Sequence, residues 1–249
     1  MIILKSQTEI DTMRAAGRIV FGVLDELKKH VRPGISTWDL DVIAEEYIRA
    51  HGAIPSFKGL YGFPATICAS ISEEIVHGIP SRKRVLQEGN VFTADVGAML
   101  DGLHADSAYT YAVGEVSPEA TRLLKVTEES LYAGIKEAKA GNHVGDIGHT
   151  VQSVAEGAGF GVVRELVGHG IGRTFHEEPQ VPNYGKPKRG PVLKVGMTIA
   201  IEPMITAGDP ATRTLEDKWT VVTLDGSLSA HFEHTIAVTA KGPEILTAK

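Results

Sequence analysis

The chain has 249 residues, of which 43% are hydrophobic and 22% are charged, a balance typical of globular proteins. Its net charge of -6 argues against broad nucleic-acid binding. The single cysteine, Cys68, excludes an intramolecular disulfide and fits a reducing compartment, so we expect a cytoplasmic protein. We see neither a secretory signal pattern nor a run of about 18 apolar residues that would span a membrane.

The first half is predicted to begin with two helices. Thr8 is expected to cap a helix that ends near Pro33, and Ser36 or Thr37 to cap a second helix that ends at Gly52. Apolar, β-branched and aromatic runs then predict three strands, at 65–71, 90–100 and 108–113. The Asp101-Gly102 turn suits a hairpin that brings Asp95 and Asp106 to one face.

The second half repeats this order of helices before strands. Ser117 followed by Pro118 is a strong helix start, and that helix should run to about residue 140. A further helix is predicted at 144–158. Strands are expected at 198–206, 220–224 and 231–239. The last two are predicted to form a hairpin around Asp225-Gly226.

A residue pattern of the first half recurs 107 positions later. The matching pairs are Gly34 and Gly141, Asp39 and Asp146, Gly52 and Gly159, Leu86 and Leu193, Gly89 and Gly196, and Asp95 and Glu202. The last pair puts a carboxylate at the same point of two comparable strands. We interpret the chain as a single domain, residues 1–249, made of two similar α+β halves, about 1–115 and 116–249. A shared site is expected in the cleft between them.

Four carboxylates and one imidazole stand in Gly-rich or apolar stretches: Asp95, Asp106, His169, Glu202 and Glu233. Each has an ordinary explanation when taken alone, such as a carboxylate at a strand end or a satisfied core histidine. Together they suit a pair of divalent metals, because carboxylates can bridge two ions and imidazole completes a coordination shell. Two bridged metals activate water and polarise a carbonyl, which is the chemistry of hydrolysis.

Two further histidines lie outside this ligand set. His77 occurs in Ile-Val-His-Gly-Ile-Pro and His176 in Thr-Phe-His-Glu-Glu-Pro. Because five other residues already satisfy the metals, these two are free to contact substrate or to transfer protons. The plainer alternative is that both are surface-loop histidines.

Four strings carry a specific resemblance: Val-His77-Gly-Ile-Pro, Gly-His169-Gly-Ile-Gly-Arg-Thr-Phe-His176-Glu-Glu-Pro, Ile-Glu202-Pro-Met and Phe-Glu233-His-Thr-Ile. In this order, and across essentially the whole chain, the sequence resembles the type I methionine aminopeptidases of peptidase family M24. The resemblance implies an α+β pita-bread fold, with pseudo-twofold related halves around a central antiparallel sheet. Its implied activity is removal of the initiator methionine from nascent polypeptides, preferentially when the second residue is small. Only thirty-one positions separate Glu202 from Glu233, which favours the short bacterial form over type II.

The resemblance also implies a role for each ligand. Asp95 is expected to chelate one metal, His169 and Glu202 the other, and Asp106 and Glu233 to bridge both. Glu202 is in addition the expected proton acceptor. The metals are Co, Mn, Fe or Zn, and the sequence does not decide among them.

The substrate side of the implied site has two parts. His77 and His176 are expected to contact the substrate and to stabilise the scissile amide as it becomes tetrahedral. The walls of an apolar methionine pocket are expected from four residues: Phe63, Cys68, Phe175 and Trp219. Each of these four has plain core packing as its alternative.

Some positions depart from the family pattern. Leu60 stands where Tyr is common, and Tyr61 is expected to point away from the pocket. Ser72 replaces a frequent Asn near a monovalent-cation site, which leaves that cation undecided. A monomer is expected. The basic segments 82–84 and 186–189 are candidates for a transient ribosome contact, although solvated loops are the simpler interpretation.

Two rival functions remain. Proline-specific peptidases share the fold and similar ligands but usually carry an extra N-terminal domain. A non-catalytic interaction protein of the same fold would have lost metal ligands, whereas this sequence keeps all five.

Overall fold

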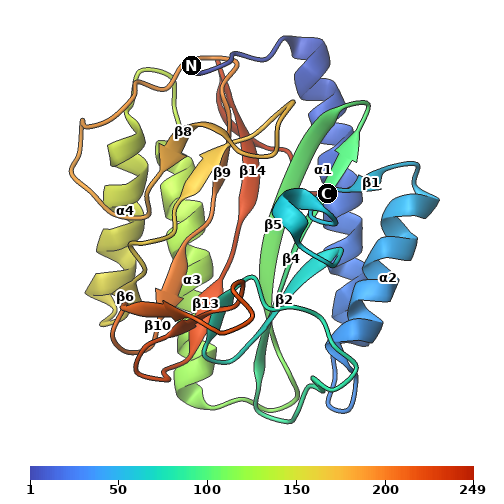
Figure 1. The fold of residues 1–249 in the computed structure, drawn as a ribbon. Helices are drawn as coiled ribbons and strands as arrows, with labels where there is room; N and C mark the ends of the chain where they lie inside the picture. The colour runs from blue at the N-terminus through green and yellow to red at the C-terminus, as the bar shows by residue number, and fades with distance from the viewer.

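The computed structural model describes all residues 1–249 as two groups of helices and strands that meet along a central seam (Figure 1). Four long helices are present: α1 (Gln7–His30), α2 (Thr37–Ala50), α3 (Pro118–Glu137) and α4 (Val144–Gly157). A short 3-10 turn, η1 (Leu60–Gly62), follows the first two. None of the helices combines the length and apolar character needed to cross a membrane.

The strands of the first half are β1 (Ile54–Pro55), β2 (Ile67–Ile71), β3 (Glu74–Val76), β4 (Val91–Leu100) and β5 (Leu103–Ala112). Those of the second half are β6 (Gly161–Val162), β7 (Gly168–Gly170), β8 (Glu177–Val181), β9 (Thr198–Ile201), β10 (Met204–Thr206), β11 (Thr212–Thr214), β12 (Val221–Thr223), β13 (Ser229–His231), β14 (His234–Thr239) and β15 (Gly242–Ile245). All pairings are antiparallel.

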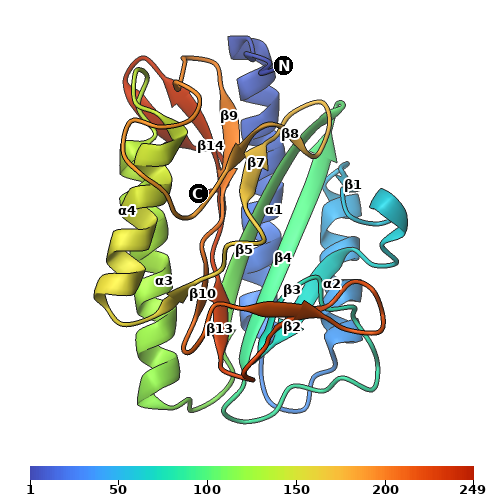
Figure 2. The same ribbon diagram turned by 60° about the vertical axis from the view of Figure 1, so that its left-hand side comes forward.

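Two sheets form the middle of the molecule. In the first, β4 lies between β1 and β2 and also pairs along its length with β5; in the second the order is β15-β14-β9-β7-β8. Figure 2 shows β5 and β14 running side by side at the seam, with α1 behind them and with α3 and α4 at the left of the strands. The predicted α+β architecture is confirmed.

The two halves use the same local construction. Gly34 and Gly141 both adopt positive φ, 91° and 94°, a conformation that glycine tolerates without steric cost. The N–H of Gly34 donates to the carbonyl of Leu86 at 2.8 Å, and the N–H of Gly141 donates to the carbonyl of Leu193 at 2.9 Å. The repeat seen in the sequence therefore corresponds to equivalent hydrogen bonds. The boundary near residue 115 stays a prediction.

The cap of the first helix is Ser6, two residues before the predicted Thr8. Ser6 is extended and its Oγ accepts from the N–H of Glu9, while the Glu9 carboxylate accepts from the N–H of Ser6. This reciprocal capping box puts Thr8 inside the first turn, so the prediction of Thr8 as cap was wrong. The N–H of Lys5 is bonded to the carbonyl of Gly196, which holds the chain extended up to Ser6. At the second helix, the Ser36 side chain is the cap.

The predicted hairpin around Asp225-Gly226 was also wrong. β12 pairs with β11 and β3, whereas β13 pairs with β10. The Asp225 carboxylate accepts from the N–H groups of Ser227 and Asp209, so the turn is tied to a different loop. The chain therefore leaves one small sheet and enters another instead of folding back on itself.

The true tight hairpin joins β4 to β5. Asp101 and Gly102 both have positive φ, 48° and 78°, as a two-residue turn of the I′ type requires. Leu100 pairs directly with Leu103. β5 thus begins five residues before the predicted Ala108, because the polar residues between them obscured the strand pattern.

Asp41 anchors the start of β2 from inside α2. Its carboxylate accepts from the N–H groups of Thr66 and Ile67 at 2.8 and 2.9 Å, and the residue is only 4% exposed. Burial raises the pKa of Asp41, although these two donors oppose the shift. The neutral amide of Asn should therefore substitute well for the carboxyl at this position.

We expect Asp41→Ala to lower the free energy of unfolding by about 2–4 kcal/mol, because two buried N–H groups lose their acceptor. Asp41→Asn keeps one oxygen in place and should cost less than half as much. Urea unfolding followed by circular dichroism measures both. Equal losses for the two variants would mean that the hydrogen bonds do not stabilise this strand start.

Candidate functional site

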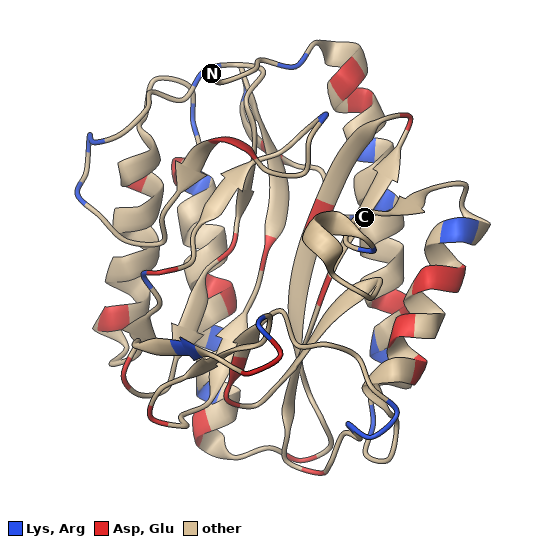
Figure 3. Cartoon of the chain, viewed as in Figure 1, with Lys and Arg blue, Asp and Glu red and all other residues tan.

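Asp95 and Asp106 are presented by the β4–β5 hairpin on one face. Asp95 lies opposite Ala108 and Asp106 lies opposite Gly97. Directly paired residues share a face, as do residues two apart on one strand. The expectation that both carboxylates face the same way agrees with this register. Figure 3 shows a few acidic segments on central strands whose ribbons are otherwise mostly uncharged.

Glu202 and Glu233 lie where two neighbouring strands are both interrupted. β9 ends before Glu202-Pro203 and β10 resumes after it, while β13 and β14 leave a gap at Phe232-Glu233. Proline cannot donate to a sheet ladder, which explains the first break. The N–H of Glu233 instead donates to the carbonyl of Ala108 at 3.0 Å. The strands predicted as continuous are therefore split at the residues that carry the carboxylates.

His169 is the middle residue of β7 and depends on its glycine neighbours. A Cβ on Gly168 would lie 2.4 Å from the carbonyl oxygen of Ala200, and one on Gly170 would lie 2.2 Å from that of Glu178. Only glycine therefore permits these close backbone approaches.

The orientation of the His169 ring follows from one hydrogen bond. Its Nδ1 lies 2.8 Å from the carbonyl oxygen of Gly170, which assigns a proton to Nδ1 and leaves Nε2 to hold a second proton or a cation. That Nε2 lies 3.5 Å from Asp106 Oδ2 and 3.7 Å from Glu202 Oε1. The imidazole is thus arranged as a ligand next to two carboxylates.

These residues form an electrostatically costly cluster. Ligand atoms of Asp106, His169 and Glu233 lie within 4.8 Å of one another, and Asp95 Oδ1 is buried without a hydrogen-bond partner. Burial, reinforced by neighbouring carboxylates, raises the pKa of Asp95 and of Glu233. Burial likewise raises the pKa of Glu202 to about 8.

A divalent cation would relieve this repulsion, and the donor set fits one, because oxygen ligands with one imidazole suit hard to borderline metals. Burial alone would lower the pKa of His169, because it disfavours the charged imidazolium. The nearby Asp106 carboxylate has the larger combined effect and raises the pKa to about 9. A cation in place of that proton would be held by the same groups.

Thr235 supports the cluster from behind. Its Oγ1 lies 2.8 Å from Asp106 Oδ1 and accepts from the N–H of Asp106 at 3.0 Å. Ser107, the next residue of β5, donates its hydroxyl to the carbonyl of Glu233. Such partners orient ligands and influence metal affinity. Neither Thr235 nor Ser107 was predicted, because nothing in the local sequence shows that a hydroxyl residue of a strand will contact the carboxylate cluster.

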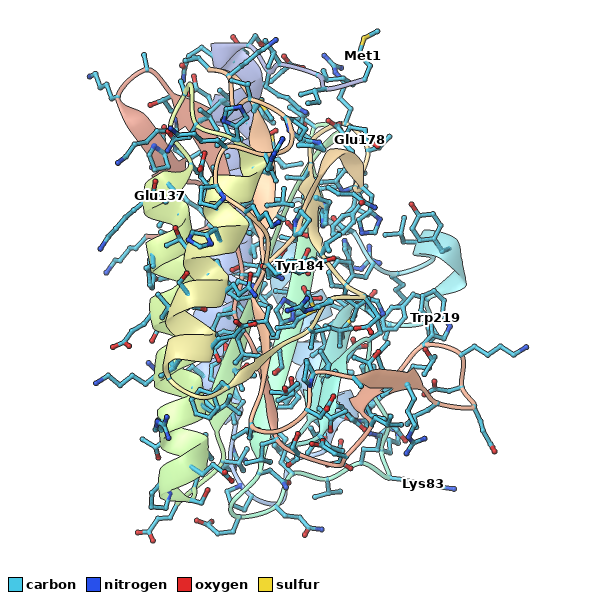
Figure 4. All side chains as sticks on the ribbon, turned by 90° about the vertical axis from the view of Figure 1, so that its left-hand side faces the viewer. Met1, Lys83, Glu137, Glu178, Tyr184 and Trp219 are labelled. Atoms are coloured by element: carbon cyan, nitrogen blue, oxygen red, sulfur yellow. The ribbon has the colours of Figure 1, made fainter.

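A cavity of about 200 Å³ opens beside the carboxylates. Its lining includes all four predicted methionine-pocket residues, Phe63, Cys68, Phe175 and Trp219. Phe63 and Trp219 meet edge to face with ring centres 5.2 Å apart. Figure 4 labels Trp219 at the loop that precedes β12.

One expectation about the cavity was wrong. Tyr61 lines it, and its ring stacks on His176 at 5.8 Å with an interplanar angle of 8°. Positive φ at Tyr61, 51°, turns the side chain toward the cavity mouth, and Leu60 lines the same wall. An L-residue rarely adopts this backbone conformation, so local sequence pattern did not predict it.

His77 and His176 both line the cavity. Burial lowers the pKa of His77; burial, with the nearby His169, lowers the pKa of His176 to about 4. Both rings are therefore neutral near pH 7 and can each donate one hydrogen bond. The His176 ring centre is 4.5 Å from that of His169, beside the carboxylate cluster.

His231 also lines the cavity and was not among the predicted site residues. It is 1% exposed, and Nε2 lies 3.7 Å from Glu202 Oε2. Strand alternation could have indicated His231, because residues 231 and 233 of one extended segment face the same side.

Comparison with known proteins agrees with this geometry. The model of metallopeptidase family M24 matches residues 11–240. This chain is a member of metallopeptidase family M24, on its methionine aminopeptidase branch. It is 56% identical to methionine aminopeptidase 1 of Bacillus subtilis and 54% identical to the methionine aminopeptidase of Clostridium acetobutylicum, each over 99% of both chains.

Comparison with solved structures gives the same family assignment. The methionine aminopeptidase of Thermotoga maritima superposes with a TM-score of 0.99 at 46% identity and full coverage of both chains. A prolidase from Pyrococcus horikoshii gives a TM-score of 0.80 at 21% identity, with 64% of its own length covered. The latter likeness shows a shared fold, which confirms the predicted pita-bread architecture.

Proposed function

We propose that this M24 member removes the N-terminal methionine from nascent polypeptides in a metal-dependent hydrolysis, preferring a small second residue. One observation supports this above the others: an apolar cavity with aromatic and sulfur-containing walls opens directly beside a cluster of carboxylates and imidazole. A thioether side chain fits such walls. Residues 1–249 act as a single catalytic domain.

The role of each ligand is taken from the resemblance to methionine aminopeptidases. Asp95 would hold one ion, His169 and Glu202 would hold the other, and Asp106 and Glu233 would be shared by both. Support comes from the shared face of the two aspartates and from the orientation of His169 Nε2 toward Glu202. Two ions of Co, Mn, Fe or Zn would satisfy this set, and a monovalent cation near Ser72 is a further part of the proposal.

The protein groups act on the substrate as follows. Divalent cations held here would polarise the peptide carbonyl and activate a water molecule. Glu202 accepts the proton of the attacking water and can pass it to the leaving amine. His77 and His176, both neutral, donate hydrogen bonds to the amide as it becomes tetrahedral. The walls Phe63 and Trp219 hold the methionine side chain.

We propose a cytoplasmic monomer whose partner is the N-terminus of new polypeptides. Transient ribosome contact through 82–84 or 186–189 is part of this hypothesis. In the first segment Arg82 covers the ring of Trp38 at 5.3 Å and Arg84 pairs with Glu74, which leaves Lys83 of this segment without an ion-pair partner.

The decisive experiment compares two tripeptides. Metal-stripped protein is assayed on Met-Ala-Ser and on Ala-Pro-Ser, and again after addition of Mn²⁺ or Co²⁺. We expect metal-dependent release of methionine from the first peptide only. Cleavage of only the proline peptide would instead support an Xaa-Pro peptidase, and no cleavage of either would support a non-catalytic interaction protein.

Replacing His77 tests the substrate side separately from the metal side. His77→Ala is expected to reduce kcat by about 10²–10³-fold, because a hydrogen bond to the developing oxyanion is lost. Metal content, measured by atomic absorption, should stay that of the wild type. A loss of bound metal in this variant would show that His77 is a ligand and not a substrate contact.

A further inference from the structure

The backbone of His231 is held rigidly at the end of β13. Its N–H donates to Thr110 Oγ1 at 2.9 Å, and the same hydroxyl donates to the His231 carbonyl at 2.8 Å. Thr110 belongs to β5, the strand that carries Asp106. Two hydrogen bonds therefore tie the backbone of His231 to the strand that carries Asp106.

The ring itself has no partner elsewhere in the protein. Both ring nitrogens of His231 are buried and make no hydrogen bond, and the residue is 1% exposed. Buried polar atoms are normally paired, and an exception is a reason to look for a function. Here the ring lines the cavity beside the cluster.

Glu202 lies between two imidazoles. Its Oε1 is 3.7 Å from His169 Nε2, and its Oε2 is 3.7 Å from His231 Nε2. Asn183 donates only to the backbone carbonyl of Glu202, so it does not hold the carboxylate. The last torsion of a glutamate side chain is soft, and a small rotation brings Oε2 within hydrogen-bond distance of His231.

We propose that His231 is a positioning residue: its Nε2–H donates to Glu202 Oε2 and thereby holds Oε1 toward the position shared with His169. This inference rests on the proposed function, since Glu202 is proposed there as a metal ligand. Partners that orient a ligand typically change metal affinity about 10–100-fold. The residue acts through Glu202 and not on the substrate.

The test measures Co²⁺ binding by calorimetry and by the visible spectrum of the bound ion, neither of which needs turnover. His231→Leu fills the same buried space without a donor, and His231→Gln restores an N–H donor. We expect the leucine variant to bind the Glu202-dependent Co²⁺ about 10–100-fold more weakly with a changed spectrum. The glutamine variant should return to within a few-fold of the wild type. His143→Gln, at the start of α4 and outside the cavity, is the matched control.

Three results would overturn the inference. Leucine and wild-type proteins with equal affinity and spectra would remove the positioning role. A glutamine variant as weak as the leucine variant would show that bulk, and not the donor, matters. A change confined to KM for longer peptides would make His231 a substrate contact only. Failure of the wild type to bind Co²⁺ would instead reject the metal site, and the proposed function with it.

Discussion

Glu202→Gln is expected to reduce kcat by about 10²–10⁴-fold, the usual range for loss of a general acid or base. The amide has nearly the shape of the carboxylate, but it cannot accept the proton of the attacking water. It also removes one of the charges that would bind a cation beside His169. Because Glu202 has both roles, this substitution should have the largest effect on turnover of any in the site.

The measurement separates the two roles. Steady-state hydrolysis of Met-Ala-Ser gives kcat and KM, and calorimetry gives the affinity for Co²⁺. Glu128→Gln is a suitable control, because Glu128 lies on α3, outside the lining of the catalytic cavity. A Glu202→Gln enzyme that keeps a near-normal rate would exclude Glu202 as the proton acceptor.

Much of the site could be predicted because its charged residues stand in apolar stretches of the sequence. A carboxylate inside an apolar strand is costly unless something pairs with it, and Asp95 and Glu202 each stand in such a run. Glycines on both sides of His169 likewise indicated close packing. The structure brings these residues together with Asp106 and Glu233, as expected from the hairpin and the repeat.

The parts that escaped prediction depend on tertiary contacts. Thr235 and His231 look like ordinary strand residues until the register places them beside Asp106 and Glu202. Tyr61 reaches the cavity through a positive φ that sequence does not reveal. The Asp225 turn was misassigned because its side chain bonds to a loop sixteen residues earlier. In each case a distant partner, and not local propensity, decides the conformation.

A buried ion pair joins the N-terminal segment to the loop that carries His176. Lys5 Nζ pairs with Glu177 Oε2, and the two side chains are only 1% and 4% exposed. The other oxygen of Glu177 accepts from the N–H groups of Arg173 and Thr174 at 2.8 and 3.2 Å. Glu177 therefore closes the loop around His176, while Lys5 neutralises its charge.

Lys5→Met should leave this carboxylate buried and unpaired, which typically costs about 3–5 kcal/mol of folding free energy. Part of that cost can be relieved if the loop opens and Glu177 reaches water. Such an opening would displace Phe175 and His176 from the cavity. We therefore expect lower kcat/KM for Met-Ala-Ser together with nearly unchanged metal content, since none of the proposed ligands lies in the loop.

The double variant Lys5→Met/Glu177→Gln tests whether Lys5 acts by neutralising the charge of Glu177. Glutamine keeps an oxygen for Arg173 and Thr174 but carries no charge, so it should restore part of both the stability and the activity lost in Lys5→Met. Urea unfolding and steady-state kinetics on four proteins, namely the wild type, Lys5→Met, Glu177→Gln and the double variant, give the coupling between the two sites. If the losses simply add, the charge of Glu177 is not what Lys5 stabilises. If stability recovers but activity does not, Lys5 itself positions the loop through its packing against Gly172, where a Cβ would meet Lys5 Cε at 2.3 Å.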